Sequence, residues 1–395
     1  MNILLIADLS SRLKDIARDL SFLAQPRYPL KELSRLFPQH QDFIQELVDV
    51  SVPFEVDIKA KRLAMDKMAK DLEHAELSAE MKFIFNRRIE DYRTLLSMMN
   101  TFYSADFFEH CKKLYGSSLR SIKDPSFQSF LDQIPDFCVP DNPTVKLQGE
   151  GAFTYLREKL KETFHPTEID VRPSTSLLSD SSAGRKVLKL NPHKEYSTQQ
   201  LDIFLVHEGW AHLGTSLNGA LQPNHPWLGT WSPGSTLLQE GLAILSELVT
   251  GVMTRERWNK VQLRHFATCM AESGSPIQDV YDFLRHHNID DLDAFKISLR
   301  VFRGVPFEGG MAFTKESLYL HGLIRLLCQL EISQTDLKTF WVGKMSFEEH
   351  EKMLLMWKEI NPTLTYYPAG LNEVMVQKRL KELQKLAVGL FSHGH

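Results

Sequence analysis

The sequence predicts a predominantly helical α+β fold with a small antiparallel sheet, and three observations support this. Apolar residues recur at helical spacing between residues 10 and 135 and again from residue 197 onward. Residues 167–191 alone combine short β-prone runs with turn-forming residues. Hydrophobic residues make up 43% of the 395 positions and charged residues 24%, as expected for a globular chain with a large core.

The N-terminal part is expected to form helix after helix. The opening stretch, MNILLIADLSSRL, lacks a basic leader and is broken at Asp8. It therefore predicts a short strand or the edge of a core element rather than a signal peptide. Ser78 is placed to cap a helix over residues 79–99, and Ser104 opens another that ends at Gly116.

A proline-marked passage predicts the main boundary of the chain. Pro135, Pro140 and Pro143 interrupt the helical pattern within nine residues. We therefore expect an N-terminal helical region over residues 1–140 and a second domain over residues 141–395. In the second domain, a helix over 152–164 precedes two or three antiparallel strands within 167–191, and the chain is then helical again.

Composition excludes several classes of protein. A formal charge of −4 argues against a nucleic-acid binder, because phosphates need a basic excess. No apolar run approaches the roughly 18 residues that cross a membrane. The cysteines are few and widely spaced, which predicts free thiols in a reducing compartment; they are Cys111, Cys138, Cys269 and Cys328. A cytoplasmic protein is the expectation.

The helix that follows Ser197 carries unusual polar residues. Ser197 and Gln200 form a capping-box pattern, which predicts a helix starting at Thr198. This helix is apolar on nearly every side, and its polar members after position 200 are Asp202, His207, Glu208 and His212. Buried charged groups must be paired, protonated or bound to metal. Two hydrogen-bonded core histidines with a salt-bridged Glu208 are the alternative, but the combination favours metal.

The spacing of the two histidines requires a helix defect. Five steps of about 100° rotate His212 roughly 140° away from His207, too far to share an ion. A π-bulge absorbs one extra residue and returns both to one face. Gly209 lies inside the interval and would ease the distortion.

A third ligand is expected from the helix over residues 235–251. Thr236 and Gln239 form a second capping-box pattern, and Gly251 is placed to end the helix. Glu240 is the preferred ligand, because small residues follow it and allow a close approach to the first helix. Glu247, two turns further on, is the competing candidate, although a supporting or surface role suits it better.

These motifs resemble those of a known family. The shared landmarks are His207-Glu208-x-x-x-His212, Gln239-Glu240-Gly241-Leu242-Ala243, RVFRG at 300–304, GGMAFTKESLYLHG at 309–322 and LYG at 114–116. Together they cover most of residues 104–330. The chain resembles the bacterial QEGLA-motif proteins and the microtubule-associated tyrosine carboxypeptidases of animals.

The resemblance implies a zinc metallopeptidase whose single ion is held by His207, His212 and Glu240, with Glu208 as the catalytic carboxylate. It also implies removal of a C-terminal residue, which is tyrosine in the animal enzymes. The expected arrangement is a zincin-like catalytic domain, with the small sheet beside the metal-binding helix.

The chemistry of such a reaction asks for further residues. Tyr319, on a helix expected to be capped by Thr314, is the first candidate for stabilising the oxyanion, and His321 is the second. Arg303 and Lys315 are the candidates for binding the substrate's terminal carboxylate, with Arg300 as an alternative.

The sequence also suggests where a peptide substrate would lie. Trp227 and Trp231, in the loop between the two metal helices, are candidates for a pocket that takes an aromatic side chain. The strand over 184–191 is a candidate free edge for an extended, acidic peptide, because it carries Arg185, Lys186 and Lys189.

Three functions remain open at this point. The first is a zinc carboxypeptidase acting on protein or peptide C-termini. The second is an endopeptidase or aminopeptidase on the same site. The third is a non-catalytic regulator that keeps the fold, against which the intact Glu208 counts, since a structural zinc site needs no general base.

Overall fold

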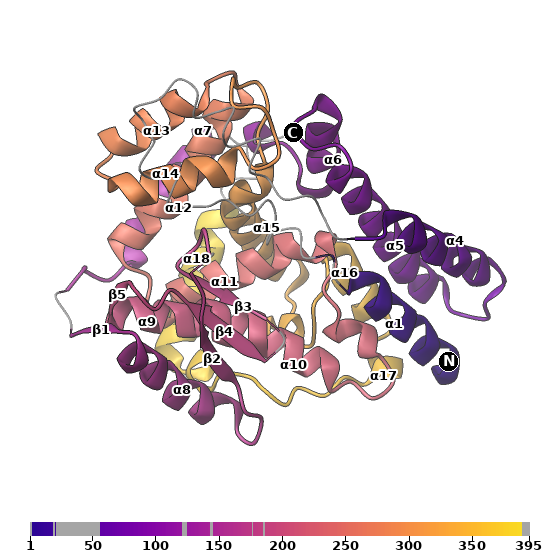
Figure 1. The fold of residues 1–395 in the computed structure, drawn as a ribbon. Helices are drawn as coiled ribbons and strands as arrows, with labels where there is room; N and C mark the ends of the chain where they lie inside the picture. The colour runs from indigo at the N-terminus through magenta and orange to yellow at the C-terminus, as the bar shows by residue number, and fades with distance from the viewer. Residues whose placement is uncertain are drawn as a thin grey trace.

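The computed structural model describes residues 2–18, 20, 56–120, 125–142, 145–175, 177–184 and 186–388. Within them helices predominate and strands are short, so the predicted α+β fold is confirmed. Figure 1 shows helices gathered around α11 and α15, with the strands and α8 at one side. Every helix of the described residues is too short or too polar to span a bilayer.

Most of the first helices lie together at one end of the molecule, and the last of them, α7, lies apart from the others (Figure 1). They are α1 (Ile3–Ala17), α4 (Ile58–His74), α5 (Ala79–Met99), α6 (Ala105–Tyr115) and α7 (Pro125–Gln133), with 3-10 turns η2 (Ser118–Arg120) and η3 (Ile134–Phe137). The caps predicted at Ser78 and Ser104 are confirmed, since each side chain accepts a hydrogen bond from the backbone three residues on. Gly116 ends α6 with φ of 80°.

The expectation of a short strand at the N-terminus is wrong, because residues 3–17 form helix α1. The Asn2 side chain caps it by accepting from the Leu5 amide, 3.2 Å away. Ile6, Leu9 and Leu13 recur at helical spacing and are fully buried. The apolar run that suggests a strand is therefore the buried face of a helix.

The strands lie in the middle of the chain, in two small sheets. The elements are β1 (Lys146–Gln148), α8 (Glu150–Phe164), β2 (Asp170–Pro173), β3 (Ser181–Ala183), β4 (Val187–Leu190) and β5 (Glu195–Ser197). β1 pairs antiparallel with β5, and β4 pairs antiparallel with β3. β2 joins β4 in parallel, so the expectation of only antiparallel strands within 167–191 is wrong for this pair, and the larger sheet has the order β2-β4-β3.

The central segment leads from the sheet into the candidate site. It comprises α9 (Thr198–Phe204), the π-helix η4 (Leu205–Leu213), α10 (Gly214–Ala220), the 3-10 turns η5 (Pro226–Gly229) and η6 (Pro233–Ser235), and α11 (Thr236–Thr250). The capping box of Ser197 and Gln200 is confirmed. The Thr236 capping box is wrong, because Ser235 precedes α11 and the box joins Ser232 to Ser235 one turn earlier.

In the C-terminal third, α15 and α18 pack against α11. The elements of this third are α12 (Arg255–Glu272), α13 (Ile277–His286), α14 (Asp291–Val301), η7 (Thr314–Ser317), α15 (Leu318–Ser333), η8 (Leu337–Trp341), α16 (Phe347–Leu355), α17 (Trp357–Ile360), η9 (Ala369–Asn372) and α18 (Val374–Val388). The prediction that Thr314 caps the following α-helix is wrong. The Thr314 hydroxyl contacts Cys111 Sγ, and Ser317 precedes α15.

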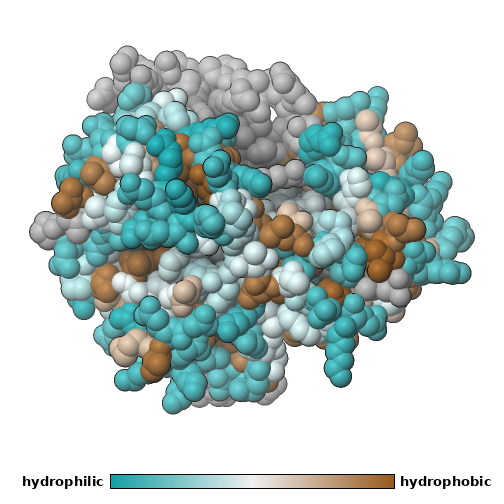
Figure 2. Space-filling model, turned by 90° about the horizontal axis from the view of Figure 1, so that it is seen from below, coloured by the Kyte–Doolittle hydropathy of each residue, from teal (hydrophilic) through white to brown (hydrophobic). Residues whose placement is uncertain are grey.

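Three apolar clusters form the core. One joins α1 and α4–α6 to α13, α14 and α16, so side chains from both sides of residue 140 share it. The second surrounds α11, α15 and α18, and the third joins α8 and the strands to the π-helix. Figure 2 shows a largely hydrophilic face on which hydrophobic residues are scattered. The division at residue 140 stays a prediction.

A buried ion pair ties the N-terminal helices to the rest of the protein. Arg88 of α5 and Glu349 of α16 are both fully buried and are joined by Nε–Oε1 and Nη2–Oε2 contacts of 2.8 and 3.1 Å. The same guanidinium donates to the carbonyls of Trp227, Thr230 and Lys344. One arginine thus fixes α5, α16 and the loop between the two site helices.

Glu349→Ala is expected to lower the free energy of unfolding by about 3–5 kcal/mol, because it leaves the Arg88 cation buried without its carboxylate. Chemical denaturation followed by circular dichroism measures this. The matched control is the adjacent Glu348→Ala, which breaks a half-exposed pair with Arg325 and should cost less than about 1 kcal/mol. Equal losses in the two variants would contradict the structural role of the buried pair.

Candidate metal centre

The helix that carries the two histidines is wound as a π-helix. Residues Leu205–Leu213 form it directly after α9, and α10 continues from Gly214. The predicted π-bulge is confirmed, and the distortion extends over nine residues. Hydrogen bonds from i to i+5 place more residues in each turn, so a residue five positions on returns to the same face. The rings of His207 and His212 accordingly lie 4.9 Å apart.

Gly209 affects how closely this helix packs, and its expected role in easing the distortion stays a prediction. Its φ is not positive, so its conformation is open to other residues. A Cβ at this position would lie 2.9 Å from Leu160 Cδ2 of α8. The absent side chain therefore lets α8 lie against the π-helix.

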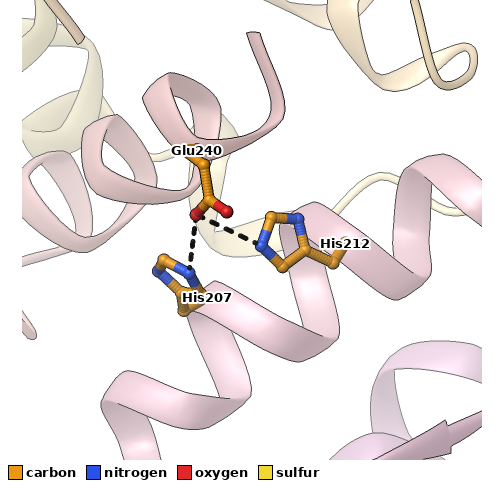
Figure 3. A group of neighbouring side chains, drawn as sticks. All are labelled: His207, His212 and Glu240. Atoms are coloured by element: carbon orange, nitrogen blue, oxygen red, sulfur yellow. Dashed lines mark ion pairs between the residues drawn. The ribbon is translucent and has the colours of Figure 1, made fainter. Parts of the chain in front are cut away.

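Three potential ligand atoms converge between the π-helix and α11. Glu240 Oε2 lies 3.5 Å from His207 Nε2 and 3.7 Å from His212 Nε2 (Figure 3). These separations are close to the edge of a tetrahedron whose metal–ligand bonds are about 2.0–2.1 Å long. Within the described residues, this is the group of histidine, cysteine and acidic side chains whose geometry suits an ion.

One carboxylate oxygen of Glu240 has no hydrogen-bond partner among the described residues, and this tests whether the site fits a metal ion. Oε2 is buried and has no hydrogen-bond partner among the described residues. Oε1, in contrast, accepts a 2.8 Å hydrogen bond from Lys315 Nζ. A buried carboxylate oxygen that faces two imidazole nitrogens is the environment that a divalent cation completes. The three side chains therefore fit a zinc ion.

The position of α11 depends on a close contact between Gly241 and a neighbouring helix, which is not the helix that we expected. A Cβ on Gly241 would lie 2.3 Å from the backbone of Gly322, so α11 and α15 touch through these two residues. The sequence predicts that the small residue beside Glu240 faces the histidine helix. In the structure this residue, Gly241, faces α15 instead. It brings η7, with Lys315, close to the carboxylate.

Glu247, the competing candidate, supports His207 from the opposite side. Its Oε1 lies 2.6 Å from His207 Nδ1, and both of its oxygens accept hydrogen bonds from Arg257. It is fully buried. Although burial acts to raise the pKa of Glu247, Arg257 and His207 lower it to about 2. A carboxylate on the second ring nitrogen fixes the tautomer and orientation of the imidazole.

The charges of the two carboxylates shape the rest of the group. Burial opposes protonation of His207, but Glu240 and Glu247 outweigh it and raise the pKa of this histidine to about 10. Burial also acts to raise the pKa of Glu240, yet Lys315 and the two histidines hold it well below its ordinary value. Glu240 is therefore ionised, the form that a metal ligand requires.

Glu208 lies beside this group, with two partners that sequence reasoning missed. Its Oε1 accepts a 2.9 Å hydrogen bond from Ser181 Oγ of β3, and the carboxylate is 8% exposed. Burial lowers the pKa of Lys344 to about 8, while Glu208 and Glu240 oppose the shift. Ser181 falls in a stretch whose composition indicates a turn, and Lys344 follows a glycine in the loop before α16. Neither position carries a local signal for a site.

The predicted substrate residues are buried among other charges. The ring of Tyr319 stacks on that of His207 at 6.1 Å, and its hydroxyl lies 3.5 Å from Arg300. Lys315 is engaged by Glu240, and Arg303 is 5% exposed beside the Phe313 ring. The roles assigned to Tyr319, Arg303 and Lys315 stay predictions.

The alternative candidates have other partners. Arg300, the alternative carboxylate-binding residue, pairs with Glu316. The ring of His321 lies 5.2 Å from that of His265 on α12.

The expectations for Trp227 and for the strand over 184–191 are wrong, whereas the role suggested for Trp231, which is half-buried, stays a prediction. Trp227 is fully buried and packs against Phe85 and Arg88, so it does not line an open pocket. β4, predicted as a free edge, is the central strand and is paired on both sides. Lys189 lies on this central strand, and Arg185 lies outside the described residues. β2 and β3 are the strands at the two edges of this sheet.

The site brings two imidazoles and a carboxylate together beside a further carboxylate. This donor set is found in many hydrolytic zinc enzymes. A family model described as microtubule-associated tyrosine carboxypeptidase matches residues 38–384, nearly the whole chain. The chain therefore belongs to the microtubule-associated tyrosine carboxypeptidase family, whose description names a peptidase activity. No curated protein sequence matches the chain at a significant level.

The two carboxylates of α11 should affect zinc affinity differently. Glu240→Gln is expected to abolish stoichiometric zinc binding, because it removes a charged ligand. Glu247→Gln should weaken affinity by about 10–100-fold and still allow full occupancy at saturating zinc, because it removes only the orientation of His207. Competition titration with a chromogenic chelator measures both. If the two variants exchanged these results, Glu247 would be the third ligand.

Proposed function

We propose that this protein is a zinc carboxypeptidase that hydrolyses the C-terminal peptide bond of a protein or peptide and releases an aromatic, tyrosine-like residue. The observation that carries the proposal is the convergence of Glu240 Oε2 with the Nε2 atoms of His207 and His212 beside Glu208. Membership of the tyrosine carboxypeptidase family supports the choice of bond and residue.

His207, His212 and Glu240 would hold the ion, since they offer two imidazole nitrogens and one ionised carboxylate oxygen. His207, whose pKa is raised, would release its proton as the ion binds. When bound, zinc supplies Lewis-acid chemistry, which polarises a carbonyl and brings the pKa of water to roughly 7. Glu247 holds the imidazole of His207 through Nδ1, so that Nε2 stays directed at the site. Lys315 performs the corresponding task for Glu240 through Oε1.

Glu208 is the proton carrier in this proposal. Its carboxylate accepts a proton from the attacking water and returns it to the amide nitrogen as the peptide bond breaks. The hydrogen bond from Ser181 engages one of its oxygens and thereby orients the other. The low exposure of His207, Glu208 and Glu240 excludes bulk water, which strengthens these electrostatic interactions.

Glu208→Gln is expected to keep the fold and zinc content and to reduce peptide release by at least about 100-fold, because an amide does not accept the proton. Release is measured by mass spectrometry of a peptide ending in tyrosine, and zinc by elemental analysis. Asp202→Asn, on the preceding turn, is the matched control and should retain activity. Wild-type turnover by the Glu208→Gln variant would remove it from the mechanism.

Amidating the C-terminus of the test peptide is expected to abolish most cleavage, whereas acetylating its N-terminus should change little. A carboxypeptidase binds the terminal carboxylate through a charge-assisted contact, and an amide leaves the matching cation unpaired. Product masses identify the bond that is broken. Cleavage in mid-chain, or equal turnover of the acid and the amide, would leave the endopeptidase alternative standing.

A further inference from the structure

Four basic side chains gather around Tyr319, and three of them have a carboxylate partner. The paired ones, each with a closest contact of 2.8–3.1 Å, are Arg257 with Glu247, Arg300 with Glu316, and Lys315 with Glu240. The fourth is Arg264, whose guanidinium carbon lies 5.7 Å from the centre of the Tyr319 ring. The cluster therefore holds one more cation than its pairs neutralise.

Arg264 is the side chain that carries this surplus charge. Within the part of the chain that the structure describes, its guanidinium makes no hydrogen bond or ion pair, and its Nε is buried. Burial lowers the pKa of Arg264, and the neighbouring Arg300 and Arg257 lower it further. Glu316 acts in the opposite direction but is already bonded to Arg300. An arginine in this position is stabilised by an anion, and the described residues do not supply one.

The position of Arg264 relates it directly to the candidate metal centre. The Tyr319 ring stacks on the ring of His207 at 6.1 Å and contacts Arg264 as well. Tyr319 thus contacts both a candidate metal ligand and the guanidinium of Arg264. Arg264 is also partly exposed, so a ligand can reach it without displacing the core.

We propose that Arg264 binds the terminal carboxylate of the substrate. The inference rests on the proposed function and names the residue that would make it a carboxypeptidase. The planar guanidinium offers parallel N–H donors that match the two oxygens of a carboxylate. Binding would neutralise the surplus charge beside Tyr319 and orient the last residue of the peptide against the site.

The other cations near the site are less suited to this role. Lys315 and Arg300 are held by Glu240 and Glu316, so a substrate would have to displace an existing ion pair. Lys344 lies within the field of Glu208 and Glu240, which places it beside the proton carrier. It is the competing cation, and the experiment includes it.

The test measures binding without turnover, in the zinc-loaded Glu208→Gln protein. Isothermal titration compares one tyrosine-ending peptide as the free acid and as the amide. Arg264→Gln is expected to weaken binding of the acid by about 10–100-fold and to leave the amide unchanged, so that the preference disappears. Arg255→Gln, on an exposed position of the same helix, is the matched control and should keep the preference.

A stability measurement separates substrate binding from a structural role. Removing an unpaired, partly buried cation should leave the thermal midpoint of the ligand-free protein unchanged or raise it, because its repulsion from Arg257 and Arg300 is relieved. A structural arginine would lower the midpoint. Arg264→Lys should retain part of the preference, since it keeps the charge and loses the paired donors.

Each outcome has one meaning. If the parent protein prefers the acid and Arg264→Gln still does, Arg264 is not the anchor, and loss of preference in Lys344→Gln would assign the role to Lys344. A lowered thermal midpoint with an intact preference would make Arg264 structural. If the parent protein binds acid and amide equally, the carboxypeptidase proposal itself fails, and the inference about Arg264 fails with it.

Discussion

The burial of two carboxylates in one apolar helix is the constraint around which the site is built. Glu240 and Glu247 lie two turns apart on α11, and neither is more than 7% exposed. Because a buried charge needs partners, each draws them from other elements. Glu240 meets both histidines and Lys315, and Glu247 meets His207 and Arg257. The π-helix, η7 and α12 are thereby held at fixed positions around α11.

The loop between the two site helices is fixed by a different interaction. Arg88 binds the carbonyls of Trp227, Thr230 and Lys344 while it pairs with Glu349, and the Tyr92 hydroxyl donates to the carbonyl of Trp231. These donors all lie on α5, in the N-terminal region. The N-terminal helices therefore support the wall of the site, although they contribute none of its candidate ligands. Loss of that support would act on the position of Lys344 as well as on the loop.

The parts of the fold and site that the sequence predicts are those governed by local rules. Caps at Ser78, Ser104 and Ser197 follow from a side chain and an amide three residues apart. The π-helical winding follows from the spacing of two histidines on a buried helix. Ser181, Lys344 and Arg264 owe their surroundings to contacts between distant segments, which no local pattern encodes. The order of the strands likewise depends on pairings that periodicity alone does not determine, so β4 is central although its sequence suits an edge.

The π-helical winding of residues 205–213 separates the spacing of ligands along the sequence from their direction in space, although the two are usually treated as one. In an α-helix, the distance between ligands along the chain determines their direction in space. Here the larger number of residues per turn absorbs the additional residue, so the same triangle of donor atoms is reached from a longer segment. The number of residues per turn is thus a variable through which insertions are accommodated without loss of geometry. A search for metal sites by fixed sequence spacing will pass over such helices, whereas a search by the arrangement of donor atoms will find them.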